Sequence, residues 1–363
     1  MLNHVLCVVV FVYKMGCDSP LKGFVDRDTG GLTFKREMSN GEKMEVGCGQ
    51  CLGCNLDYSR MWAMRITHEA AMYEYNGGNS FVTLTYRDAA ACDTKQLEKG
   101  LHVPDDWSLK KSHFQRFMKR LRKHFNDREI RYFYAGEYGR NCKHGLDIER
   151  VGCPLCNCGR PHFHGCLFGI TFNDLEAYET DGGITRFTSP TLERLWGYGF
   201  VDVGDLTFAS ASYTARYVVK KVKGYQGPNH YQSTDMDGEI TFISPEFVGM
   251  SRGKTCKLHK GLPYQVDCPD CSRGIGRDWI EKYFEDVYPS DQVPVPGAGV
   301  MSGVPRYYDK VLEERDPEMY ERIKAKRRKY IKQNPEEFTP RRLETKHKVK
   351  KAKLELFSKR DKN

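Results

Sequence analysis

The order of helical and extended patterns along the chain constrains its fold most. The clearest helical pattern covers Ser112–Phe125, where apolar residues recur on one face and Ser112 with Gln115 forms a capping-box pattern. Other helical patterns cover 56–75 and 210–222. Extended patterns, rich in β-branched and aromatic residues, cover 80–86, 130–135, 162–170 and 200–203. This order predicts an α+β domain in which helices cover one face of a central antiparallel sheet.

Composition divides the rest of the chain. Residues 15–287 hold these patterns and are predicted to form one folded domain, followed by a Pro/Gly-rich linker at 288–305. Residues 306–363 contain 20 Lys and Arg against 11 Asp and Glu, which accounts for the whole net charge of +9. A basic helical tail of this kind attracts polyanions, although a solvated charged helix is an equal alternative.

The first residues predict no membrane association. The apolar run Leu2–Tyr13 is 12 residues long, too short to span a bilayer, and it lacks a small-residue cleavage site. The sequence MGCDSPL begins at Met15. We therefore expect residues 1–14 to be a non-native upstream extension.

The 14 cysteines favour zinc over disulfides, because most fall in CxxC-type clusters with no convincing secretory signal before them. The first group is Cys48, Cys51 and Cys54, with Cys17 as the candidate fourth ligand. The last group is the most self-contained and joins CxxH to CxxC: Cys256, His259, Cys268 and Cys271. We expect these ions to stabilise loop-rich segments and to have no catalytic role.

The middle group offers more ligands than one tetrahedral ion needs: Cys142, His144, Cys153, Cys156 and Cys158. Two arrangements are open here. Cys142 can complete a site together with His144 or Cys158, or Cys153 and Cys156 can combine with His162 and His164 in a Cys2His2 site.

Two histidines give the first sign of a reactive site. His162 and His164 flank Phe163 on an extended pattern, so both imidazoles face the same side of the strand, about 6–7 Å apart. Two neutral imidazoles on one face can chelate a divalent ion, although two histidines bonded within a loop region have the same pattern.

Two tyrosines give the second sign. Tyr213 and Tyr217 are spaced i,i+4 on the later helix and share one face, with Lys220 and Lys221 just beyond. An aromatic stripe packed in a core is the simpler interpretation of the pair alone.

Together these motifs resemble the HUH superfamily of single-strand endonucleases, and within it the replication initiators of microviruses, small phages with circular single-stranded DNA. SRGIGRDW (272–279) and CGQCLGC (48–54) also resemble the gokushovirus branch. The resemblance covers roughly Cys17 to Tyr283. Four segments occur in the family's order: FVTLTY (81–86), AGEYG (135–139), GRPHFHGCLFG (159–169) and YTARYVVKK (213–221).

The resemblance implies an HUH nicking domain at 15–287, with an RRM- or ferredoxin-like core and zinc-binding insertions at 142–158 and 256–271. His162 and His164 would be ligands of a catalytic Mg²⁺ or Mn²⁺. Glu137 is the candidate third ligand, with a surface or structural glutamate as the alternative.

The implied chemistry uses the two tyrosines as alternating nucleophiles. Attack by Tyr213 or Tyr217 would leave a 5′-phosphotyrosine and a free 3′-OH, and Lys220 or Lys221 would stabilise the developing negative charge. A phenol with a pKa of about 10 needs such help at neutral pH.

The primary hypothesis is therefore a rolling-circle replication initiator that nicks single-stranded origin DNA and rejoins the ends. It would act in the cytoplasm of an infected bacterium with host DNA polymerase. The sequence holds no helicase P-loop, so duplex unwinding would need a host helicase. One alternative is a zinc-stabilised nucleic-acid-binding protein that does not cut. The other is a plasmid relaxase or transposase of the same superfamily.

Overall fold

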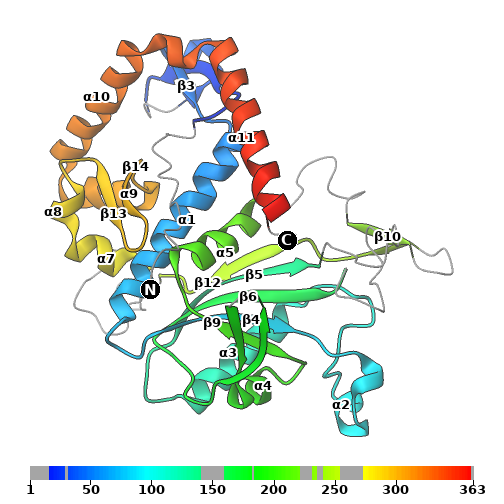
Figure 1. Cartoon of the computed structure of the whole chain (residues 1–363). Helices are drawn as coiled ribbons and strands as arrows, with labels where there is room; N and C mark the ends of the chain where they lie inside the picture. Colours follow the sequence, from blue (N-terminus) through cyan, green and yellow to red (C-terminus); the bar gives the residue numbers. More distant parts are fainter. Residues whose placement is uncertain are drawn as a thin grey trace. The chain divides into compact units, whose positions relative to one another are not determined.

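The structure is a computed structural model, and it forms two compact units (Figure 1). The larger unit holds residues 62–283 with 295–297, and the smaller unit holds the residues before 62 with 284–294 and those from 298 on. Side chains are not described at 218–220, 233–234, 240–241 and 357–360. The backbone is described for residues 16–28, 32–139, 159–181, 184–220, 231–234, 240–253 and 273–360.

A seven-stranded antiparallel sheet is the centre of the larger unit, with strand order β12-β5-β6-β4-β9-β8-β7 (Figure 1). The α+β class and the antiparallel sheet expected from the sequence are confirmed. The strands are β4 (Asn79–Thr85), β5 (Arg131–Tyr138), β6 (Pro161–Phe168), β7 (Glu176–Asp181), β8 (Ile184–Thr188), β9 (Val201–Gly204) and β12 (Phe247–Met250).

Helices pack on both faces of this sheet, so the prediction of helices on one face is wrong. On one face, α3 (Lys111–His124) and α4 (Pro190–Trp196) share a core with Phe163 of β6. On the other, the part of α1 (Leu52–Tyr73) from Trp62 on and α5 (Phe208–Lys220) share a core with Phe168. β6 therefore buries side chains on both of its sides.

The start of α3 also differs from the prediction. The helix begins at Lys111 after the N-cap residue Lys110, which makes no side-chain cap, so the expected capping box of Ser112 is wrong. Two basic residues of α3 are used inside the unit. Arg120 donates to the carbonyls of Leu195 and Trp196, and Arg122 donates to the carbonyl of Ile130.

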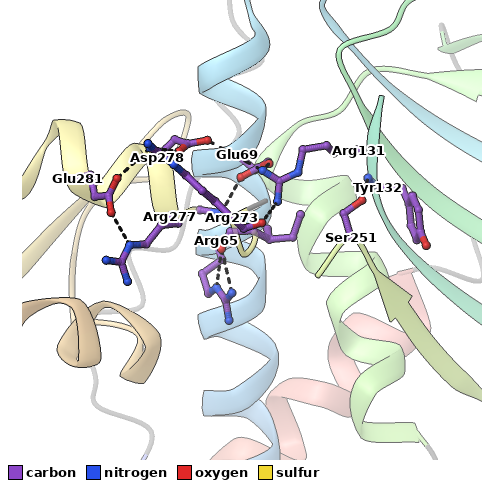
Figure 2. Close-up of polar contacts among 11 residues, drawn as sticks. Arg65, Glu69, Arg131, Tyr132, Ser251, Arg273, Arg277, Asp278 and Glu281 are labelled. Atoms are coloured by element: carbon purple, nitrogen blue, oxygen red, sulfur yellow. Dashed lines mark hydrogen bonds and ion pairs between the residues drawn. The ribbon is translucent and has the colours of Figure 1, made fainter. Parts of the chain in front are cut away.

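An ion network ties α1 to β5 and to the segment before α7 (Arg277–Lys282), as Figure 2 shows. Arg131 Nη1 lies 3.0 Å from Glu69 Oε1, and both side chains are almost fully buried. The amide of Gly276 donates to Glu69 Oε2 at 2.6 Å. The Arg273 side chain contacts Asp278, and the Arg273 carbonyl accepts from Arg131. This network fixes the α1 layer against the sheet.

Shorter elements complete the larger unit. They are η2 (Ala89–Ala91), α2 (Thr94–Glu98), β10 (Gln232–Thr234) and β11 (Ile240–Phe242), the last two paired with each other.

The smaller unit has a three-stranded sheet of order β2-β1-β3 and several helices. The segment expected as a linker carries the paired strands β13 and β14. No described helix has the length and apolar character needed to cross a membrane. The elements are β1 (Leu21–Asp26), β2 (Leu32–Thr33), η1 (Arg36–Met38), β3 (Ser39–Val46), α8 (Phe284–Val287), β13 (Gln292–Val295), β14 (Gly299–Ser302), α9 (Arg306–Arg315), α10 (Pro317–Gln333), η4 (Pro335–Phe338) and α11 (Pro340–Arg360).

Candidate metal and nucleophile site

The pairing of β5 with β6 brings three predicted ligands together. Glu137 lies directly opposite His162, and His164 lies opposite Ala135, two positions along the same face. Strand alternation sends the side chain of Phe163 to the other face, into the α3 core. The two histidines and the glutamate therefore share the α5 side of the sheet.

One carboxylate oxygen faces both imidazoles. The Nε2 atoms of His162 and His164 each lie 2.8 Å from Glu137 Oε1. The donor atoms of the three residues all lie within 4.8 Å of one another. Glu137 and His164 are buried, and His162 is half-buried. The group is compact enough for a single ion.

The outer nitrogen of each imidazole is held by a neighbour. His162 Nδ1 lies 3.1 Å from the carbonyl oxygen of Arg160, which only accepts, so Nδ1 carries the proton. His164 Nδ1 lies 3.1 Å from Thr83 Oγ1. In neutral His162 this leaves the lone pair of Nε2 directed at the carboxylate of Glu137. Such an arrangement needs a proton or a cation between the atoms, so the donor set fits a divalent metal ion.

The charge state of Glu137 agrees with this role. Burial raises its pKa, but hydrogen bonds from His162 and His164 outweigh burial and hold the pKa below its usual value. Glu137 is therefore ionised at neutral pH and available as a metal ligand.

The two tyrosines of α5 lie against His164. The Tyr213 hydroxyl oxygen is 3.4 Å from His164 Nε2. The Tyr217 ring stacks on the imidazole, with centroids 5.5 Å apart and an interplanar angle of 12°. The two phenol rings are 5.1 Å apart because the i,i+4 spacing stacks them on one helix face.

The tyrosines differ in burial. Tyr217 is only 2% exposed, whereas Tyr213 is half-buried. Burial raises the pKa of Tyr217, and the charge of Glu137 raises it further. The Arg216 guanidinium lies 5.4 Å from the centroid of the Tyr213 ring. Of the two phenols, Tyr213 is the more accessible to a substrate.

The remaining predicted residues separate into two classes. Lys220 ends α5, but its side chain and all of Lys221 lie outside the described residues. The middle and last cysteine groups also lie outside them, and so does the Cys153 and Cys156 half of the alternative Cys2His2 site: Cys142, His144, Cys153, Cys156, Cys158, Cys256, His259, Cys268 and Cys271.

The first cysteine group is assembled in the smaller unit. The sulfur atoms of Cys17, Cys48, Cys51 and Cys54 all lie within 4.8 Å of one another, so this group can hold a metal ion. Burial raises the pKa of Cys48, but amide hydrogen bonds, the first of them from Gln50, lower it to about 7.

Sequence reasoning missed the two residues that orient the imidazoles. Thr83 holds His164 from β4, where it is paired directly opposite. Arg160 holds His162 through its carbonyl, and its side chain is anchored on Asp88 at 2.6 Å. Thr83 lies within the FVTLTY segment, but its role becomes visible only once the register of β4 and β6 is known.

Comparisons with known proteins place the chain among phage replication proteins. The family model of replication-associated protein ORF2 matches residues 79–146, which contain β4, α3 and β5. Replication-associated protein ORF2 of Spiroplasma virus 4 is 33% identical over 249 residues, 66% of this chain and 66% of that protein. No solved structure matches the chain at a significant level.

Two further relatives match different lengths of the chain. Replication-associated protein VP4 of Bdellovibrio phage phiMH2K is 28% identical over 86% of this chain and 82% of its own. Replication-associated protein ORF4 of Chlamydia phage 1 is 30% identical over 48% of this chain and 38% of its own. All three are microvirus proteins, which confirms the resemblance found in the sequence.

Proposed function

Because this chain belongs to the family of microvirus replication-associated proteins, we propose that it starts rolling-circle replication by nicking single-stranded origin DNA. The observation that carries the proposal is the 3.4 Å approach of the Tyr213 hydroxyl to His164, within the group that includes His162 and Glu137. A nucleophile beside a compact set of metal ligands is the arrangement that phosphodiester transfer needs.

The proposed cofactor at this group is Mg²⁺ or Mn²⁺, held by His162, His164 and Glu137. When bound, the ion supplies polarisation of the scissile phosphate. The mixed imidazole and carboxylate donors suit such an ion when phosphate oxygens and water complete the shell.

The residues of the chain supply the nucleophile and its position. The Tyr213 oxygen loses its proton to solvent and forms a bond to phosphorus, while the bond from phosphorus to the 3′ oxygen breaks. The 3′ oxygen takes up a proton, so the products are a 5′-phosphotyrosine and a 3′-OH end. Lys220 and Lys221, just after the pair in sequence, are proposed to stabilise the developing charge.

Two phenols allow a second cut while the first still holds DNA. After one round of synthesis, Tyr217 attacks the regenerated origin, and the released 3′-OH attacks the old phosphotyrosine to close the circle. The ring separation of 5.1 Å supports access of both residues to one phosphate position. Each transfer conserves a phosphodiester bond, so joining needs no ATP.

The proposed partners follow from this chemistry. The 3′-OH end primes a host DNA polymerase, and a host helicase unwinds the duplex, in the cytoplasm of the infected bacterium. We further propose an HUH-type core for the sheet of the larger unit and Zn²⁺ at Cys17, Cys48, Cys51 and Cys54. Zinc at the other two cysteine groups stays a prediction from the sequence.

The test is formation of a covalent protein–DNA adduct. Purified full-length protein is incubated with single-stranded origin DNA and Mn²⁺ or Mg²⁺, and adducts are resolved by denaturing electrophoresis. We expect one labelled adduct that depends on the divalent ion and is lost in Tyr213→Phe/Tyr217→Phe. Absence of any adduct with all divalent ions would instead favour the zinc-stabilised binding protein.

A further inference from the structure

The four-cysteine group in the smaller unit has the dimensions of one tetrahedral zinc site. Cys17 Sγ and Cys51 Sγ lie 3.7 Å apart. Zinc–sulfur bonds of about 2.3 Å in a tetrahedron place sulfur atoms about 3.8 Å apart. The separation in the structure is therefore the one that a bound zinc ion would impose.

Backbone amides surround the sulfur atoms. The amide of Cys48 donates to Cys17 Sγ at 3.2 Å, and the amide of Cys51 donates to Cys48 Sγ at 3.3 Å. The amide of Asp18 donates to Cys51 Sγ at 3.1 Å. Amide hydrogen bonds stabilise thiolates, the form that binds metal. Asp18 is thus bonded to the group through its own backbone, besides following Cys17 in sequence.

The side chain of Asp18 points to a different part of the chain. Its carboxylate accepts from Lys350 Nζ at 2.5 Å and from His347 Nδ1 at 3.1 Å, both on α11. It also accepts from the amide of Gly53, in the first turn of α1, at 2.9 Å. Lys350 donates in addition to the carbonyl of Gly16 at 2.7 Å. The region where β3, the start of α1 and α11 meet appears in Figure 1.

This contact is buried, unlike the other ion pairs of α11. The side chains of Asp18 and Lys350 are 5% and 9% exposed. By contrast, the Lys348–Glu344 pair of the same helix is 73% and 65% exposed. A buried, multiply bonded pair contributes much more to docking than a solvated one, because breaking it strands a desolvated charge.

The helix held in this way is strongly basic. The 21 residues of α11 include nine Lys and Arg against two Glu. Repulsion among these cations opposes docking against a protein surface, so a specific anionic anchor is needed to hold the helix in place.

We propose that zinc binding by Cys17, Cys48, Cys51 and Cys54 fixes the Asp18 carboxylate and thereby docks the basic helix α11 onto the smaller unit. We name the set of Cys17, Asp18, His347 and Lys350 the zinc clasp. Loss of zinc leaves four sulfur atoms without their shared cation, so the backbone at Cys17 and Asp18 relaxes and the anchor of Lys350 is lost. The clasp takes the four-cysteine group as a zinc site and does not depend on DNA nicking.

The first measurement is the zinc content of the full-length chain, by elemental analysis. Cys17→Ser and Cys48→Ser are each expected to lose one zinc ion per chain relative to the wild type. The control is Cys92→Ser, a free cysteine outside the group, which is expected to lose none. Equal zinc content in all variants would overturn the proposal.

The second measurement is hydrogen exchange of the backbone amides of α11. Exchange in residues 343–353 is expected to be about tenfold faster or more after zinc removal by a chelator, and to slow again when zinc alone is restored. This comparison uses the wild-type chain, so a variant that fails to fold does not affect it. Unchanged exchange in the zinc-free chain would overturn the proposal.

Two variants then separate docking from metal binding. Lys350→Met lies far from the cysteines in sequence and is expected to keep its zinc while α11 exchanges about tenfold faster. Asp18→Asn is expected to behave in the same way. Lys348→Ala, in the exposed pair of the same helix, is the matched control and should leave exchange unchanged. Equal exchange in Lys350→Met and Lys348→Ala would show that the buried contact does not hold the helix.

Discussion

The Tyr213 hydroxyl lies 3.4 Å from Nε2 of His164, whereas Tyr217 presses the face of its ring against the same imidazole. Tyr213 is therefore placed for the first attack, and Tyr217 must move before its oxygen can reach a phosphate. We expect Tyr213→Phe to slow the first nick about 100-fold, because the remaining phenol starts from a misplaced position. Tyr217→Phe should slow it by no more than about threefold.

The measurement is single-turnover cleavage of a labelled origin oligonucleotide. Each single variant should retain some cleavage, and the double variant should have none. Full cleavage by the double variant would remove both tyrosines from the mechanism.

Thr83 is expected to tune metal binding through His164. Thr83→Val removes the 3.1 Å contact to His164 Nδ1 while keeping the shape of the side chain. Loss of such an outer partner lowers metal affinity by about 10- to 100-fold. Titration of Mn²⁺ against the metal-free chain measures it.

Thr85→Val is the matched control on the same strand, because Thr85 Oγ1 donates to the carbonyl of Phe200 and does not contact either histidine among the described contacts. Equal Mn²⁺ affinity in the Thr83 and Thr85 variants would contradict the positioning role of Thr83.

Arg131 is expected to be essential for stability of the larger unit. Arg131→Met leaves the buried Glu69 without its 3.0 Å partner, so the free energy of unfolding should fall by about 3–5 kcal/mol. Glu69→Gln should cost less, because burial raises the pKa of Glu69 to about 7 and a neutral side chain is already tolerated there. Urea denaturation compares both with Arg128→Met, which breaks an exposed pair with Asp127. An equal loss in Arg128→Met would rule out a special role for the buried pair.

Asp57 is expected to make stability depend on pH. Burial raises its pKa from 3.8 to about 6, so the folded state holds this proton more tightly than the unfolded state. Stability from the protonated form is complete below pH 3.8 and is lost as the pH rises through about 6. Asp57→Asn should therefore raise the free energy of unfolding by about 1–3 kcal/mol at pH 7.5 and by progressively less toward pH 4.

Denaturation at both pH values measures this difference, with the exposed Asp105→Asn as the control. A gain for Asp57→Asn that is the same at both pH values would contradict the titration of Asp57 as its cause.

The candidate site was more predictable than the layers around it. Period-2 alternation alone placed His162 and His164 on one face, and helical spacing alone placed Tyr213 beside Tyr217. Glu137 needed the register of β5 with β6, which a single sequence does not determine. The resemblance to known replication initiators supplied that choice.

The second helix layer was missed although β6 carries a sign of it. The face of β6 that begins with His162 continues with Cys166 and Phe168, both fully buried. A face that turns apolar after two polar residues must be covered, here by α1 and α5. The capping box of Ser112 failed for a simpler reason, because α3 begins one residue earlier and Ser112 falls inside its first turn.

The register of β5 with β6 has a practical consequence. Eight consecutive residue pairs, from Arg131 with Phe168 to Tyr138 with Pro161, hold Glu137 opposite His162. The ligands are therefore aligned by the ladder itself, and the length of the chain that joins the two strands does not set their positions. We expect a foreign peptide spliced into that connection to leave the reactive face intact, which offers an attachment point for tethering the molecule to a solid support.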